Sequence, residues 1–328
     1  MSAFPRTITV KFVDFWPSFD ENDNKFLAAL RSGVDAQVIP SSSPEIPDLL
    51  FYSQFGMRHL DYESSVKIYY TGENDVPDFN ECDYAISFHH IDFGRRHLRY
   101  PIYMLYEHEE LGSGHYAPAA RQAVERPFCS FLMRNHYNCD PRRLEIVDAV
   151  ESYRPIAYGG PWRNNIGGPV EEKIPFIAGY KFNLALENSL LPGYVTEKLL
   201  EPLVADTVPI YWGPDDAADE FNPEAFMRVR DYNDTASFVE ALRALDTDDA
   251  AYMVMLRAPK LNADRNLDFD ARLAEFLGSI AKTMRKQTVS YGLAGSFHRK
   301  NLRIRPFLES RNFIRLTKFL ARFSSKNK

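Results

Sequence analysis

Short apolar runs recur along the first third of the chain, each bounded by turn-forming residues. Runs of this length, rich in β-branched and aromatic residues, are typical of buried strands. They predict strands at residues 7–15, 36–39, 49–53, 66–71, 84–88 and 100–106, with a short helix at 22–31. Because strands that alternate with helices and loops favour a mostly parallel sheet, we expect this part to form a Rossmann-like α/β domain.

A second series of the same kind begins near residue 128. It predicts strands at 128–133, 155–158, 182–186, 209–212 and 227–229, and helices at 141–152, from 197 onward and at 234–245. The chain is therefore expected to be of the α/β class, with two Rossmann-like domains facing each other across a cleft. We place the first domain at 1–120, the second at 121–290 and a C-terminal tail at 291–328.

The stretch at 178–213 carries the most specific chemistry. After its strand and a loop, Thr196 can cap a helix whose first turn holds Lys198. A cation there opposes the positive end of the helix dipole, and a nearby anion would relieve the conflict. Because open α/β sheets bind phosphates at such helix starts, a diphosphate bound there would relieve it; an exposed lysine on a capped helix is the alternative, and the pattern alone leaves both open. Pro202 removes a helical hydrogen bond, which predicts a kink or a later helix start.

Composition describes a globular protein. The chain has 328 residues, of which 45% are hydrophobic and 14% aromatic, enough for the cores of two domains. Its net charge of −6 argues against a general nucleic-acid partner. Cys82, Cys129 and Cys139 show neither a disulfide framework nor zinc spacing, which suits a reducing compartment. With no secretory signal and no apolar run near about 20 residues, we expect a cytoplasmic protein without a spanning helix.

The charge is distributed unevenly. From Arg299 to Lys328 the chain carries six Arg and four Lys against one acid, a net of +9, which leaves −15 for the remainder. As a helix, residues 311–323 would place Phe and Leu on one side and Arg and Lys on the other. Such a helix suits peripheral contact with the inner face of an anionic membrane. The alternative is a helix packed on the first domain with its basic face in solvent.

Three segments share their residues and their order with one enzyme family. They are Thr-Gly-Glu-Asn at 71–74; Glu-Asn-Ser at 187–189 with Gly-Tyr-Val-Thr-Glu-Lys at 193–198 and Val-Pro-Ile-Tyr-Trp-Gly at 208–213; and Glu-Phe-Asn-Pro at 220–223. Together they resemble the signature of the α1,3/4-fucosyltransferases, an inverting family that uses GDP-fucose. The resemblance implies a GT-B-type fold, with the nucleotide in the second domain and the acceptor mainly in the first.

Inverting transfer needs a base and a clamp for the leaving group. The acceptor hydroxyl attacks one face of the anomeric carbon while GDP leaves from the other, so a carboxylate beside the hydroxyl can take its proton. The resemblance implies that this base is Glu73. Asp75, Asp78 and Glu107 are weaker candidates because no signature surrounds them. The departing diphosphate gathers negative charge, and the resemblance implies Lys198 as a cation that stabilises it.

A second cation and three donor contacts are implied in the same way. Arg143, at the start of the helix predicted at 141–152, is implied as the second phosphate ligand, with its neighbour Arg142 as the alternative. Arginine can bind phosphate oxygens through two parallel hydrogen bonds. Asn188 and Tyr194 match positions that bind the donor's phosphates, and Glu197 matches the position that holds the ribose. For Tyr194, packing beside the loop is the structural alternative.

We predict no cofactor and no catalytic metal. The Asp-x-Asp pairs at 246/248 and 268/270 have the spacing of Mn²⁺ sites in other sugar-nucleotide transferases. Both pairs lie in the acidic C-terminal helical region, away from any predicted strand end. The eight histidines show no ligand spacing. Cationic side chains are already implied at the diphosphate.

The resemblance therefore implies transfer of fucose from GDP-fucose to the 3-hydroxyl of N-acetylglucosamine in an oligosaccharide, with the 4-hydroxyl as the alternative. Lewis-type surface glycans and chitin-like oligomers are suitable acceptors. Two other hypotheses stay open: a transferase of the same fold that uses another sugar nucleotide, and a catalytically silent protein that binds glycans or nucleotides.

Overall fold

The computed structural model describes residues 6–287, apart from 41–44, 107, 135–139 and 263–267, together with residue 304. The tail segment 311–323, Glu107 and Cys139 lie outside these residues, so the predictions made for them stay predictions. Within the described part of the chain, none of the helices is long and apolar enough to cross a lipid bilayer.

The first domain is built on a six-stranded parallel sheet with the order β2-β1-β3-β4-β5-β6. Its elements are β1 (Thr7–Val13), α1 (Lys25–Gly33), β2 (Gln37–Pro40), β3 (Leu49–Tyr52), η1 (Arg58–Asp61), β4 (Val66–Thr71), β5 (Tyr84–Ser87), β6 (His97–Arg99), η2 (Ile102–Leu105) and η3 (His108–Glu110), where η marks a 3₁₀ helix. All six residues of β4 are buried, as expected of a parallel strand covered on both faces.

The second domain is built on a five-stranded parallel sheet with the order β11-β10-β9-β7-β8. Its elements are α2 (Ala120–Glu125), β7 (Cys129–Phe131), α3 (Arg142–Tyr153), β8 (Ile156–Tyr158), α4 (Lys173–Ala178), β9 (Phe182–Leu186), α5 (Glu197–Val204), β10 (Val208–Trp212), η4 (Asp215–Asp219), η5 (Pro223–Ala225), β11 (Met227–Arg228), η6 (Val229–Asp231), α6 (Thr235–Thr247) and α7 (Asp249–Arg257). Strand β9 lies at the centre of the sheet and is wholly buried.

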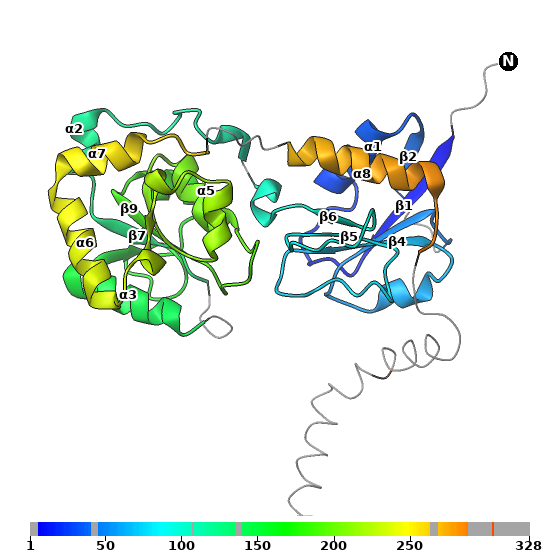
Figure 1. The fold of residues 1–328 in the computed structure, drawn as a ribbon, viewed down its shortest axis with the longest axis horizontal. Helices are drawn as coiled ribbons and strands as arrows, with labels where there is room; N and C mark the ends of the chain where they lie inside the picture. The colour runs from blue at the N-terminus through cyan, green and yellow to red at the C-terminus, as the bar shows by residue number, and fades with distance from the viewer. Residues whose placement is uncertain are drawn as a thin grey trace, which may run out of the picture.

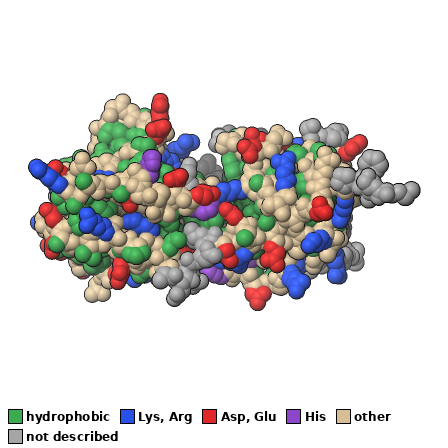
Figure 2. All heavy atoms as spheres, turned by 90° about the horizontal axis from the view of Figure 1, so that it is seen from above, with side chains coloured by type: hydrophobic (Ala, Val, Ile, Leu, Met, Phe, Trp, Pro, Cys, Tyr) green, Lys and Arg blue, Asp and Glu red, His purple; other side chains and the backbone are tan. Residues whose placement is uncertain are grey.

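Two parallel α/β sheets in separate lobes confirm the predicted fold class. The lobes lie side by side, with α6 and α7 on the side of the second domain that faces away from the first (Figure 1). In the space-filling view, acidic, basic and histidine side chains gather at the waist between the lobes (Figure 2).

The prediction of a strand at 100–106 is wrong. The sixth strand, β6, lies just before it, and most of the predicted segment forms the 3₁₀ helix η2. The N–H of Met104 donates to the carbonyl of Pro101 at 3.1 Å, which turns the chain away from the sheet. Because Pro101 has no N–H to donate to a neighbouring strand, the sheet ends before it.

Helix α8 (Phe269–Thr283) packs on the first domain, although it follows the second in sequence. It runs beside α1 (Figure 1), and the two helices approach most closely at glycines. A Cβ added to Gly278 would lie 2.3 Å from the carbonyl oxygen of Gly33. The second domain was predicted to span residues 121–290, but α8 lies within that range and packs on the first domain. The chain therefore crosses between the domains twice. An amphipathic helix with no strand after it carries no local sign of which sheet it covers.

Candidate functional site

The carboxyl end of β9 and the start of α5 form the centre of the site. Thr196 has extended backbone angles, and its hydroxyl accepts a hydrogen bond from the N–H of Lys198. The predicted cap is therefore confirmed, and the later helix start that Pro202 suggested is not observed. Helix α5 has only eight residues and ends at Val204, two residues after Pro202. The missing N–H thus falls in the last turn of the helix.

The ammonium of Lys198 is held among oxygen atoms. It lies 2.9 Å from Oε1 of Glu197, 3.2 Å from Oγ1 of Thr196 and 3.8 Å from Oε2 of Glu187. Burial alone would lower the pKa of Lys198, but the two carboxylates outweigh it and the pKa lies above its ordinary value. Burial raises the pKa of Glu197, but the charge and hydrogen bond of Lys198, together with the charge of Lys173, lower it overall. Lys198 is therefore a permanent cation with a fixed position.

A cavity of about 420 Å³ opens beside these residues. The predicted residues Arg143, Asn188, Glu197 and Lys198 all line it, together with Gly159, Gly160, Lys173 and Glu201. The ammonium of Lys173 pairs with the Glu201 carboxylate at 2.9 Å. Sequence reasoning missed these last two residues, because the segment before β9 carried no predicted helix and Glu201 belongs to no motif. The cavity is lined by both cations and carboxylates. Cations suit the phosphates of a sugar diphosphate, and carboxylates suit its hydroxyls.

Arg143 enters the cavity from the start of α3, and Arg142 does not. The Arg143 guanidinium donates to Oδ1 of Asn188 at 2.8 Å, and the N–H of Asp140 donates to the Asn188 carbonyl at 3.1 Å. These two bonds fix Asn188 against the helix start. Arg142 instead pairs with Glu145 on the same helix, and both side chains are exposed. Of the two arginines, the structure thus brings Arg143 to the site.

Tyr194 lies where the two domains touch. The residue is 3% exposed, and its ring meets Phe88 of the first domain edge-on at a centroid distance of 5.1 Å. The preceding Gly193 has a φ of +82°, and a Cβ there would lie 2.4 Å from the Phe88 carbonyl oxygen. Only glycine suits this close approach. Burial raises the pKa of Tyr194 to about 12, and its packing role is observed directly.

Glu73 projects from the loop after β4 in the first domain. The Glu73 N–H and the Thr71 hydroxyl lie 3.1 Å apart, in a tight turn at the strand end. Burial raises the pKa of the Glu73 carboxyl, the charge of Lys198 lowers it and that of Glu197 raises it, with a net upward shift. Glu73 does not line the cavity, but the charge of Lys198, which belongs to the other domain, acts on its pKa.

The third sequence motif lies between the domains rather than in the cavity. The carboxylate of Glu220 accepts from the guanidinium of Arg99 at 2.5 Å and from the hydroxyl of Tyr103 at 2.6 Å. Glu220 is buried, and both partners belong to the first domain. This motif therefore joins the domains.

Of the two Asp-x-Asp pairs, the one at 246/248 has structural roles. Asp246 is buried and pairs with Lys181 at 2.9 Å and Arg154 at 2.6 Å, whereas Asp248 caps α7. Each carboxylate already serves a separate contact.

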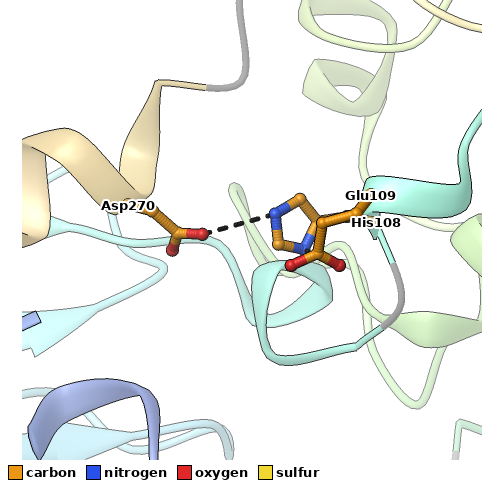
Figure 3. Close-up of side chains that lie close together, drawn as sticks. All are labelled: His108, Glu109 and Asp270. Atoms are coloured by element: carbon orange, nitrogen blue, oxygen red, sulfur yellow. Dashed lines mark ion pairs between the residues drawn. The ribbon is translucent and has the colours of Figure 1, made fainter. Parts of the chain in front are cut away.

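Among the described residues, one group with metal-ligand geometry is formed by His108, Glu109 and Asp270 (Figure 3). Sequence spacing missed it because Asp270 lies on α8, far along the chain. The two ring nitrogens of His108 face different carboxylates, Nδ1 toward Glu109 at 3.5 Å and Nε2 toward Asp270 at 3.4 Å. Lys25 adds its ammonium at 3.4 Å from Glu109 and 3.9 Å from Asp270. A cation that is part of the protein therefore already offsets part of the charge of these acids.

Comparison with known proteins identifies the family. The sequence matches two family models in tandem, the alpha-(1,3)-fucosyltransferase FucT N-terminal domain at residues 10–106 and the glycosyltransferase family 10 (fucosyltransferase) C-terminal model at 125–260. It is 30% identical over 318 residues to the alpha-(1,3)-fucosyltransferase FucT of Helicobacter pylori, a match that covers 84% of this chain and 66% of that protein.

Solved structures show the same architecture. An alpha1,3-fucosyltransferase crystal structure matches with a TM-score of 0.72 at 29% identity, covering 87% of this chain and 91% of that chain. A crystal structure of an alpha1,3-fucosyltransferase with GDP-fucose matches with a TM-score of 0.69 at 27% identity, covering 87% and 92%. The two facing α/β domains are thus of the GT-B type, and the chain belongs to the fucosyltransferases of glycosyltransferase family 10.

Proposed function

We propose that the chain transfers fucose from GDP-fucose to the 3-hydroxyl of an N-acetylglucosamine in an oligosaccharide, with inversion at the anomeric carbon. One observation carries the proposal: a carboxylate of the first domain, Glu73, lies near enough to the ammonium of Lys198 for the two charges to interact. The donor is supported by the related structure that contains GDP-fucose. The linkage is supported by the name of the Helicobacter pylori relative.

In the proposed step, Glu73 takes the proton of the acceptor hydroxyl while the hydroxyl oxygen forms a bond to the anomeric carbon of fucose. On the opposite face, the bond from that carbon to the β-phosphate oxygen breaks, and its electron pair leaves with GDP. The raised pKa of Glu73 makes it a stronger base than an ordinary surface carboxylate. A base placed in this way contributes roughly 10²–10⁴ to the rate.

The second domain would stabilise the leaving group. Lys198 and Arg143 line the same cavity, and their fixed charges meet the diphosphate as it becomes more negative. Because Oδ1 of Asn188 accepts from Arg143, we assign the Asn188 NH₂ group to a phosphate oxygen. We assign Glu197, which also lines the cavity, to the ribose hydroxyls. Tyr194 does not line the cavity, and the assignment of its hydroxyl to the phosphates rests on the family resemblance.

Glu73→Gln tests the assignment of the base. We expect turnover of GDP-fucose to fall by roughly 10²–10⁴, with GDP affinity within about twofold of the wild type, because the amide cannot accept the proton. Asp75→Asn is the matched control on the same loop, since the Asp75 carboxylate accepts from the Tyr69 hydroxyl instead of facing Lys198. A larger loss of turnover in Asp75→Asn than in Glu73→Gln would reassign the base.

A panel of donors and acceptors tests the substrates. We expect GDP-fucose to be consumed far faster than other GDP-sugars and UDP-sugars, and the product to carry fucose on the 3-hydroxyl of N-acetylglucosamine. Preference for another sugar nucleotide would favour the second hypothesis. Tight GDP binding without turnover of any donor would favour a binding protein, and linkage analysis by NMR would distinguish the 3-hydroxyl from the 4-hydroxyl.

We also propose that donor binding uses no metal. Lys198 and Arg143 supply positive charge where a divalent ion would otherwise neutralise the diphosphate. Activity should therefore be unchanged after treatment with EDTA. A loss of activity that Mn²⁺ or Mg²⁺ restores would overturn this proposal.

For the tail, we propose cytoplasmic location with peripheral contact at the inner membrane face through residues 311–323. The support is the basic, amphipathic pattern of that segment. The full chain should co-sediment with vesicles that contain anionic lipid, and a chain truncated before residue 311 should not. Equal sedimentation of the two chains would reject the proposal.

A further inference from the structure

Glu187 is a buried carboxylate at the centre of the site to which the proposed mechanism gives no role. It directly follows β9 and is 0% exposed. Its own N–H donates to the carbonyl of Trp212 on β10 at 2.8 Å, which anchors the residue to the sheet. Burying a carboxylate costs free energy unless it is paired and hydrogen-bonded. A group of this kind therefore requires partners that use its charge.

Those partners are the cap of α5 and the lysine in its first turn. Oε1 of Glu187 accepts from the N–H of Thr196 at 2.8 Å, and Oε2 accepts from the Thr196 hydroxyl at 2.8 Å. The same hydroxyl accepts from the N–H of Lys198 at 3.3 Å and from its ammonium at 3.2 Å. A hydroxyl has one proton and two lone pairs, so these three contacts use all of them. The chain of bonds has one direction, from Lys198 through Thr196 to Glu187.

We propose that Glu187 is a positioning residue that orients the Thr196 hydroxyl and thereby sets where Lys198 presents its ammonium to the diphosphate of the donor. The inference rests on the proposed function. Both oxygens of Glu187 act as acceptors, so the arrangement requires the carboxylate form. Without the Glu187 carboxylate, the Thr196 hydroxyl is free to rotate. The carboxylate of Glu197 is then the remaining short contact of the Lys198 ammonium.

The charges around Glu187 make this role sensitive to pH. Lys198 and Glu197 face it from α5, Tyr194 from the preceding loop and Tyr211 from β10. Burial raises the pKa of Glu187 to about 7, against the opposing effect of Lys198. The carboxylate that orients Thr196 is therefore fully present above neutral pH and is lost as the pH falls below it. Glu73 titrates in the other domain and acts on kcat, whereas Glu187 acts on the KM for the donor.

Charge alone makes the opposite prediction. Removal of a negative group 3.8 Å from Lys198 would make the net charge of the site more positive and would tighten diphosphate binding. If positioning dominates, the same removal weakens binding, because Lys198 loses its fixed orientation. The sign of the change in donor KM therefore distinguishes the two effects.

The variants Glu187→Gln and Thr196→Val test the inference. Each should raise the KM for GDP-fucose about tenfold at pH 8, equivalent to one lost hydrogen bond to a charged group, with a smaller change in kcat. Because both act along one chain of bonds, the double variant should be no worse than the worse single variant. In the wild type the KM should rise as the pH falls from about 8 to about 6, and in Glu187→Gln it should stay level.

Asp206→Asn is the matched control. Asp206 lies just beyond the other end of α5, is largely buried and has Lys260 at 4.0 Å, so the change also replaces a carboxylate beside a lysine by an amide. Its donor KM should equal that of the wild type. An unchanged or lower KM in Glu187→Gln, or additive effects in the double variant, would overturn the inference. If the wild type consumes no GDP-fucose, that result counts against the proposed function alone. The GDP affinities of the wild type and Glu187→Gln, measured by calorimetry, then still test the role of Glu187.

Discussion

Substitution of Glu220 should weaken the joint between the domains without touching the cavity. Its carboxylate accepts from Arg99 and Tyr103 of the first domain, and the side chains of Glu220 and Arg99 are 8% and 17% exposed. In Glu220→Gln the charge is lost, and the amide NH₂ must face one of the two donors. Breaking a fully buried ion pair costs about 3–5 kcal/mol. Since Arg99 keeps some access to water, we expect a loss of about 2–3 kcal/mol in the free energy of unfolding.

Calorimetry can measure this loss as a shift in melting temperature. With an unfolding entropy of about 2.1 cal/mol/K per residue over roughly 280 residues, a loss of 2–3 kcal/mol lowers the Tm by about 3–5 °C. The matched control is Asp215→Asn, because Asp215 pairs with Arg230 at 2.9 Å nearby while their side chains are 73% and 38% exposed. That change should cost no more than about 0.5 kcal/mol. Equal Tm shifts in the two variants would refute the view that Glu220 joins the domains.

Three further outcomes are expected. Gly193→Ala, which places a Cβ 2.4 Å from the Phe88 carbonyl oxygen at a φ of +82°, should displace the donor loop and raise the KM for GDP-fucose about tenfold in steady-state assays. Gly278→Ala should lower the Tm by several degrees in thermal melts and leave GDP affinity unchanged, because the contact it breaks joins α8 to α1. Burial lowers the pKa of His59, but hydrogen bonds to carboxylates, chiefly that of Asp14, raise it overall above 6.5. The stability gained from His59 is therefore present below pH 6.5 and is lost as the pH rises through the folded-state pKa, so urea titrations of His59→Gln should show a flatter pH dependence than the wild type.

Local signals were sufficient for the elements that build the site. The limits predicted for β4 and β9 agree with the structure residue for residue, because both strands are short apolar runs that end in polar turns. The cap at Thr196 was predictable for the same reason, since its hydroxyl bonds within two residues along the chain. These features depend on nearest neighbours in the sequence.

Features that depend on distant partners could not be predicted. The place of α8 depends on the close approach of Gly278 and Gly33. The group of His108 and Asp270 likewise forms only because α8 returns to the first domain. The resemblance marked the Glu-Asn-Ser segment as a donor contact, yet a pattern could not show that Glu187 points inward to Thr196.

The residues of the family signature fall into two groups with different physical tasks. Glu73 and Lys198 carry the opposite charges proposed for the reaction, and each is fixed by its own domain. Their separation therefore depends on how the domains meet, and no strand or helix of either domain can set it alone. Gly193 and Glu220 make that contact, through the Phe88 backbone and Arg99. A substitution at either position should thus slow the transfer step without changing a group that touches the donor, because a small change in the placement of reacting groups is sufficient to lower the rate.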